Sequence, residues 1–161
     1  MIRLLRPLAR DERGASIIEL ALVAPFLGSL LIGMVDLSRG YSEKLQLEQA
    51  AQRAIEKAMN GEKSTDLFNT LKTEGATAAG VNASAVTVNY WLECAGVSQN
   101  TSAATMQSDY EDKKCSDGVP YARYVTVSIQ KSYTPMFSSE WLGSNPDGSF
   151  TLVGEAGVRV Q

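Results

Sequence analysis

A single carboxylate, that of Glu19, lies near the start of a long apolar segment. Among the 21 residues from Ala15 to Val35 it is the only charged side chain. A helix of this length spans about 31 Å, which matches the hydrocarbon thickness of a bilayer. A charge at the centre of such a span costs about 2.5–3.5 kcal/mol, and somewhat less near its end. A carboxylate at this place in a membrane span therefore indicates a function, and it needs a positively charged partner.

The charges that precede the apolar segment predict its orientation. Four arginines stand there against Asp11 and Glu12, namely Arg3, Arg6, Arg10 and Arg13. The positive-inside rule then places the N-terminus in the cytoplasm and the bulk of the chain outside. The formal net charge of the whole chain is −3, so its composition indicates no basic surface for nucleic acid.

Both cysteines, Cys94 and Cys115, fall in the part predicted to be exported. An even number of cysteines there indicates a disulfide that closes a polar loop, and two buried thiols are the alternative. Two sulfurs without histidine fall short of a tetrahedral metal site, so we expect no metal and no cofactor. The lack of histidine also excludes Ser-His-Asp and Cys-His catalysis, and we expect no catalytic residue and no enzyme.

Three kinds of processing fit residues 1–35. A cleaved secretory signal peptide is excluded because the apolar run is too long and no A-x-A site follows it. An uncleaved signal anchor explains the arginines and the length, but it leaves Glu19 without a role. The third possibility is a cut on the cytoplasmic side, between Gly14 and Ala15, which keeps the whole apolar segment on the mature protein.

The residues around that bond resemble a class III prepilin signal: a basic leader ending in Gly14, the small residue Ala15, and glutamate at the fifth mature position. The fuller stretch GASIIELALVAPF, followed by GMVDLSR, resembles the TadE-like pseudopilins of tight-adherence (Flp-type) pilus systems. Pro25 and Asp36 fit the family pattern, whereas Leu20 stands where Phe or Tyr is more usual. General secretion pseudopilins are close relatives, but they usually begin with Phe or Met and lack this proline.

The resemblance implies a minor pilin or pseudopilin that primes or caps a pilus. Cleavage by a prepilin peptidase would expose an α-amino group on Ala15, one helical turn from Glu19. The resemblance implies that Glu19 pairs with the amine of a neighbouring subunit and so sets the register of assembly. A glutamate that only reaches the headgroups is the alternative. The implied partners are the peptidase, the major Flp-type pilin, other minor pilins and an inner-membrane assembly platform.

The sequence predicts four consecutive regions: a leader at 1–14, a transmembrane segment at 15–35, an amphipathic helical continuation at 36–60 and an exported head at 61–161. Pro25 removes a backbone hydrogen bond in mid-span and is expected to kink the helix. One helix from 16 to 59 is predicted, with two helices broken near 38–40 as the alternative. We expect one continuous apolar side on its second half, formed by Leu37, Tyr41, Leu45, Leu47, Ala51, Ala54, Ile55 and Ala58.

The sequence of the head predicts an α+β fold. A short helix is expected within 61–80, capped near Ser64 or Thr65, followed by about three antiparallel strands at 86–92, 124–133 and 150–160. A helical turn is predicted at 138–142. The acidic cluster at 109–117 lacks the spacing of a calcium loop and is expected to be solvated. The predicted fold is pilin-like, with a long, partly transmembrane N-terminal helix packed on a small antiparallel sheet, plus one short helix.

Two functions follow from these patterns. The first is the minor pilin, located in the inner membrane with a single pass and its C-terminal domain in the periplasm or outside, with incorporation into the pilus as the alternative. The second is a single-pass anchored domain that binds or senses an extracytoplasmic ligand. Replacement of residues 1–35 by an unrelated anchor would preserve the second function and abolish the first.

Overall fold

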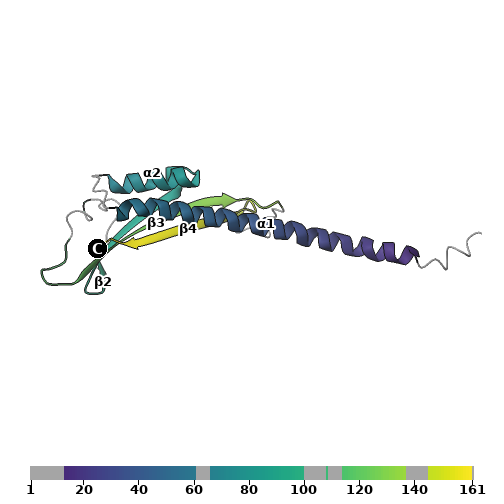
Figure 1. Cartoon of the computed structure of the whole chain (residues 1–161), viewed down its shortest axis with the longest axis horizontal. Coiled ribbons are helices and arrows are strands. Elements are labelled where there is room, and N and C mark those ends of the chain that lie inside the picture. The colour runs from purple at the N-terminus through teal and green to yellow at the C-terminus, as the bar shows by residue number, and fades with distance from the viewer. Residues whose placement is uncertain (1–12, 61–65, 100–107, 109–113, 137–144, 161) are drawn as a thin grey trace, which may run out of the picture. The chain divides into compact units, whose positions relative to one another are not determined.

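The computed structural model describes residues 13–60, 66–99, 108, 114–136 and 145–160. The chain divides into two compact units, Met1–Arg39 and Gly40–Gln161, and we call the second unit the head. Helix α1, Arg13–Met59, contributes to both units, and Figure 1 shows the order of the elements. Residues 1–12 of the predicted leader and the helical turn predicted at 138–142 lie outside the described residues.

Helix α1 extends through residues 38–40, so the alternative of two helices broken there is wrong. The segment consists largely of good helix formers and has no proline after Pro25, which explains why the helix persists. It ends where the sequence predicts, because the backbone N–H of Asn60 donates the last bond, of 3.0 Å, to the carbonyl of Glu56.

Only part of the predicted apolar side of α1 is buried. Leu47, Ala51, Ala54 and Ile55 are at most 5% exposed, together with Ala50. The earlier apolar positions are not buried, since the exposed fractions are 76% for Leu37, 63% for Tyr41 and 38% for Leu45. Leu45 precedes Leu47 by two residues, which turns it by about 200° around the helix axis. Leu45 therefore lies on a different face from Leu47, whereas Leu37 lies about five full turns before Ile55 on the same face, but belongs to the first unit.

The head contains one antiparallel sheet with the strand order β2-β1-β3-β4. Its strands are β1 (Val86–Cys94), β2 (Val97–Gln99), β3 (Tyr121–Tyr133) and β4 (Phe150–Arg159). The inward face follows the predicted alternation, with Val86, Val88, Tyr90 and Leu92 of β1 and Val125, Val127 and Ile129 of β3 all buried. The three predicted strands are confirmed, and β2 is a fourth that the sequence analysis missed.

Strand β2 follows β1 through the two-residue turn Ala95–Gly96, since Cys94 pairs with Val97. Both turn residues have positive φ, 49° at Ala95 and 81° at Gly96. Two successive residues of positive φ form the type of hairpin turn that matches the twist of antiparallel strands. An alanine in the first of these positions is unusual, and this hid the turn from sequence analysis.

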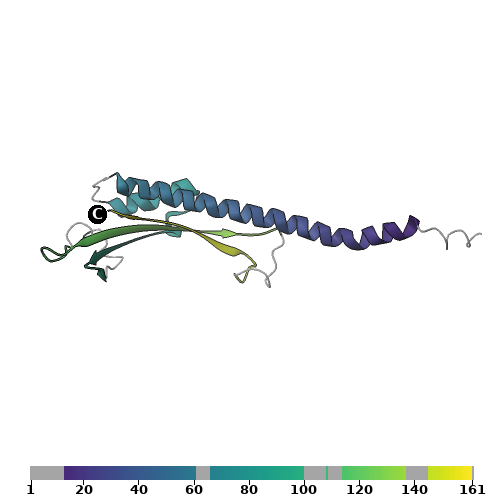
Figure 2. The same cartoon turned by 60° about the horizontal axis from the view of Figure 1, so that its bottom comes forward.

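Helix α2, Leu67–Ala79, packs with the head part of α1 on one side of the sheet (Figure 2). Its buried residues include Leu67, Phe68 and Leu71, as predicted. The cap differs from the prediction, because Asp66 holds the N-cap position and Ser64 and Thr65 lie outside the described residues. At the C-terminal end Gly80 adopts the left-handed conformation, with φ 64°, that ends many helices. The observed architecture is therefore α+β and pilin-like.

Helix α1 approaches β4 very closely at Gly154. A Cβ atom placed on Gly154 would lie 2.5 Å from the backbone nitrogen of Glu48, and it would also overlap the carbonyl carbon of Leu47. The small side chains of Ala50, Ala51 and Ala54 on the same helix are also buried. An isolated glycine within a strand often marks such close contact with another backbone, which is the signal that sequence analysis passed over.

Candidate functional site

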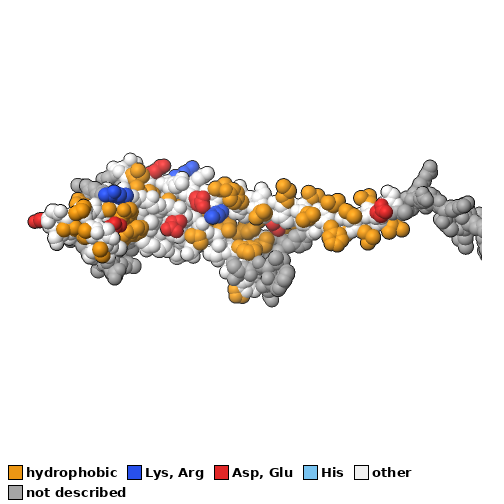
Figure 3. Space-filling view, turned by 90° about the horizontal axis from the view of Figure 1, so that it is seen from below, with side chains coloured by type: hydrophobic (Ala, Val, Ile, Leu, Met, Phe, Trp, Pro, Cys, Tyr) orange, Lys and Arg blue, Asp and Glu red, His pale blue; other side chains and the backbone are white. Residues whose placement is uncertain are grey.

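The first unit presents an apolar helical surface whose large side chains are exposed within the described residues. Near the N-terminus one helix is long and apolar enough to cross a membrane, and none of its most apolar window is buried. Ile17 is 70% exposed, Phe26 72% and Met34 72%. Figure 3 shows hydrophobic side chains along this part of α1. Because water contact with so many large apolar side chains is unfavourable, the surface requires lipid or other helices.

Gly14, Ala15 and Glu19 all belong to α1, which begins at Arg13. Ala15 and Glu19 are four residues apart, so they share a helix face with a rise of about 6 Å between them. The Glu19 side chain is exposed, and within the described part of the chain it takes part in no ion pair. The carboxylate is thus available to a cation from outside the chain, or to the amine that a cut before Ala15 would create.

Pro25 lies inside α1, and the helix continues on both sides of it. Pro25 has no N–H to donate to the carbonyl of Ala21. One turn later the hydroxyl of Ser29 donates a hydrogen bond of 2.8 Å to the carbonyl of Phe26. The expected kink at Pro25 stays a prediction.

Within the head, two contacts that sequence analysis missed join the end of β3 to the first turns of α1 after Gly40. A Cβ atom on Gly40 would lie 3.4 Å from Cε1 of Tyr133, so the tyrosine ring rests against the helix backbone. The ammonium of Lys131 lies 2.6 Å from the carboxylate of Glu43. Their separation of 88 residues explains why no local pattern reveals the ion pair. Together these contacts join the last residues of β3 to the beginning of the head.

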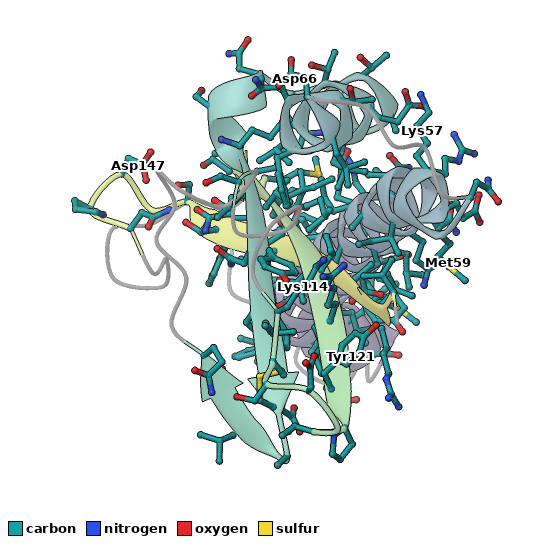
Figure 4. The ribbon with its side chains drawn as sticks, turned by 90° about the vertical axis from the view of Figure 1, so that its left-hand side faces the viewer. Lys57, Met59, Asp66, Lys114, Tyr121 and Asp147 are labelled. Carbon is teal, nitrogen blue, oxygen red and sulfur yellow. A yellow bond between two sulfur atoms is a disulfide. The ribbon has the colours of Figure 1, made fainter. Side chains whose placement is uncertain are left out.

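At the other end of the sheet a disulfide joins Cys94, the last residue of β1, to Cys115, with 5.8 Å between the two Cα atoms (Figure 4). The alternative of two buried thiols is therefore wrong. The bridge holds the chain that leads into β3 against the end of β1. A nearby hollow of about 220 Å³ is lined by residues that include Lys114, Tyr121 and Arg123. A second hollow nearby, of about 420 Å³, falls within the range of about 300–1,000 Å³ that is usual for small-ligand pockets, and its lining includes Glu93, Tyr124 and Arg159.

The described residues include no group of three or more histidine, cysteine, aspartate or glutamate side chains that could hold a metal ion. Most of the acidic cluster predicted to be solvated, Asp109, Glu111 and Asp112, lies outside the described residues. The candidate site that the sequence predicts, the exposed segment of α1 with Glu19, lies within the described residues.

Comparison with known families gives a match at this same segment. Residues 14–55 match the family described as TadE-like protein, and so confirm the resemblance noted from Gly14 to Arg39. The matched region includes the candidate cleavage bond, Glu19, the apolar segment and the face of α1 that packs on the sheet. No curated protein and no solved structure matches the chain.

Proposed function

Residues 14–55 are TadE-like, and from this premise we propose that the chain is a minor pilin or pseudopilin that primes or caps a tight-adherence pilus. The TadE-like family is structural and not enzymatic, and it is associated with this pilus system. The single observation that carries the proposal is that the family match coincides with a fully exposed apolar helix containing one carboxylate. An assembly protein needs such a surface, because it must rest first in lipid and then against other helices.

In this proposal residues 1–14 are a cytoplasmic leader, 15–35 cross the inner membrane once, 36–60 continue the helix and 61–161 form the exported head. A prepilin peptidase cuts between Gly14 and Ala15. Glycine offers the least steric hindrance at the cleaved bond. The new amine of Ala15 has a pKa near 7.7–8.0 in a free peptide, so a large fraction of it is charged at neutral pH.

The proposed role of Glu19 is to pair with the Ala15 amine of a neighbouring subunit. A charge-assisted hydrogen bond in a medium of low dielectric constant is stronger than the same bond in water. A subunit shifted along the helix axis would leave both charges unpaired in an apolar environment, at a cost of several kcal/mol. The pair therefore favours one axial register. The major pilin, other minor pilins and the assembly platform are the partners that this role requires.

The first test is the N-terminal mass of the mature protein. Expression with a prepilin peptidase should yield a protein that begins at Ala15, and expression without the peptidase should retain the leader. The matched control is Gly14→Val, whose branched side chain should slow cleavage more than tenfold. A mature protein that still begins at Met1, or a cut beyond residue 30, would overturn the proposal.

The second test is Glu19→Ala, with Glu48→Ala as a control that removes a carboxylate from the head part of the same helix. We expect Glu19→Ala to leave cleavage and membrane insertion unchanged and to reduce pilus number at least tenfold. Insertion should even improve slightly, because the change removes a charge from the span. Normal pili in the Glu19→Ala strain would show that the register role is wrong.

Replacement of residues 1–35 by an unrelated membrane anchor distinguishes the proposal from an anchored binding or sensing domain. The proposed function requires Glu19 and its helix surface, so the replacement should abolish pilus assembly. Full function with the foreign anchor would favour the binding domain instead.

A further inference from the structure

One end of the head must lie close to the membrane if residues 15–35 cross it. Five residue steps separate Val35, the last residue of the apolar run, from Gly40, the first residue of the head. Even a fully extended chain covers no more than about 18 Å in five steps, and a helical one covers about 7.5 Å. Gly40 therefore lies at or near the headgroup layer, whatever the orientation of the head.

The head residues next to Gly40 come from two strand ends. Tyr133, whose ring rests on Gly40, is the last residue of β3 and pairs with Phe150, the first residue of β4. The ion pair of Lys131 with Glu43 holds the same end of β3 against α1. The beginning of the head and this edge of the sheet therefore form one side of the domain.

Large apolar and aromatic side chains gather on this side. Tyr41 is 63% exposed, Met136 62% and Phe150 36%, and Tyr133 is half-buried between the helix and the strand end. We call these four residues the proximal rim. The charged residues beside it balance one another: Lys131 pairs with Glu43 at 2.6 Å and Lys44 with Glu48 at 3.7 Å, and Asp36 and Arg39 on α1 carry opposite charges. The proximal rim therefore offers apolar and aromatic surface with little net charge.

We infer that the proximal rim is a lipid-contact surface by which the head rests on the interfacial layer of the membrane. The inference rests on the proposed insertion of residues 15–35. Aromatic side chains with a polar tip, tyrosine above all, concentrate at the level of the headgroups, where the ring meets apolar surface and the hydroxyl meets water. The headgroup region is about 5–8 Å thick on each side of the bilayer, which matches the 7.5 Å rise from Val35 to Gly40.

The surface differs from one that binds a membrane by basic residues. Its charges of opposite sign balance one another, so attraction to anionic lipid contributes little, and the contact depends on apolar area. Addition of salt or of anionic lipid should therefore change the extent of this contact, measured as lipid quenching of a label at Met136, by less than twofold. In this inference the phenyl and tyrosyl rings set the depth of the head, and the Lys131–Glu43 pair keeps the end of β3 against the head part of α1.

The test uses the full chain in phosphatidylcholine vesicles, with an environment-sensitive fluorophore on a single added cysteine and the disulfide kept oxidised. Met136→Cys reports on the proximal rim, and Leu30→Cys reports on the span. Val97→Cys is the matched control, because Val97 is 63% exposed but pairs with Cys94 beside Tyr121, at the far end of β3. The 12 steps from Tyr121 to Tyr133 place the two ends of β3 roughly 40 Å apart.

Lipids with a quencher near the headgroup should quench the label at Met136 at least threefold more than the label at Val97. The label at Leu30 should respond most to a quencher deep in the acyl chains. If Leu30 is quenched but Met136 behaves like Val97, the rim inference alone is wrong. Protection of Met136 from aqueous iodide without quenching by lipid would also overturn it, in favour of a covering protein copy. Without lipid quenching at Leu30 the proposed span is wrong, and the rim inference falls with it.

Discussion

At the scale of single residues, Ser149 holds together the turn that precedes β4. It is only 1% exposed, and its hydroxyl accepts hydrogen bonds from Ser132 at 3.0 Å and Asn145 at 2.9 Å. It donates one of 2.7 Å to the Asp147 carboxylate, which also accepts the backbone N–H of Ser149 at 3.0 Å. A buried hydroxyl with all these partners satisfied is favourable, whereas removal of its partners would cost about 1–3 kcal/mol. Figure 4 shows Asp147 on this turn.

These bonds predict a pH dependence. The hydrogen bond from the Ser149 hydroxyl, and next the one from its N–H, hold the pKa of Asp147 below its ordinary value of 3.8. The stabilisation is therefore fully present above pH 3.8 and is lost as the pH falls through the lowered pKa of the folded state. Asp147→Asn keeps the acceptor oxygen but not the charge, so its urea midpoint should fall less than that of the native chain between pH 5 and about 2.

Ser149→Ala provides the matched control, because it removes the hydroxyl donor and leaves the carboxylate in place. It should weaken the same acid dependence and lower stability at neutral pH as well. Equal pH profiles for the native chain and Asp147→Asn would contradict this account of the turn.

At the scale of secondary-structure elements, the contact between α1 and β4 depends on one glycine. Any side chain at Gly154 would overlap the helix backbone at Leu47 and Glu48, and a helix backbone cannot move without disturbing the whole core. We expect Gly154→Ala to destabilise the head by about 2–3 kcal/mol, at the upper end of overpacking effects. The measurement is the urea midpoint of the full chain in detergent micelles, followed by tryptophan fluorescence.

Gly157→Ala is the control on the same strand. Its Cβ would meet Cγ2 of Thr126 at 2.8 Å, on the outward face of the sheet, where a side chain rather than a backbone must move. A loss below about 1 kcal/mol is expected there. Similar losses for the two variants would show that strand conformation, and not the approach of α1, explains the glycine at position 154.

At the scale of the whole molecule, the buried core of the described residues lies entirely within residues 40–161. The core runs from Leu47 on α1, through α2, to Ile129 on β3, and no residue of the first unit belongs to it. The fragment 40–161 should therefore unfold cooperatively in the absence of residues 1–39. Its free energy of unfolding should lie within about 1 kcal/mol of that of the head in the full chain, as expected for separate units.

A shorter fragment that begins at Leu67 gives the matched comparison. It keeps the whole sheet and α2 but loses the side chains of Leu47, Ala51 and Ile55, which are at most 5% exposed. Without that layer the part of the inner face that α2 does not cover faces water, and we expect no cooperative transition. A cooperative transition in the shorter fragment would mean that α1 is not part of the core.

Much of this protein can be predicted from local patterns in its sequence. A 21-residue apolar run, its arginines and Glu19 indicate a membrane segment and the pilin-like signal, because each depends on composition and spacing along one helix. The alternation of Val86, Val88 and Tyr90 predicts both a strand and its buried face, since side chains on a strand point alternately to two sides. The cysteine count indicates the disulfide, and the family match covers the same N-terminal segment.

Tertiary structure decided the rest. Both the Tyr41–Leu45 face and the Leu47–Ile55 face of α1 are apolar, so periodicity could not tell which one the sheet covers. The sheet covers the second face, where Gly154 allows the backbone of α1 at Leu47 and Glu48 to approach β4. Similarly, Tyr133 meets Gly40 and Lys131 meets Glu43 across some 90 residues of chain. Contacts between distant residues depend on the complementary shapes of two folded surfaces. The spacing of residues along the chain does not predict these shapes.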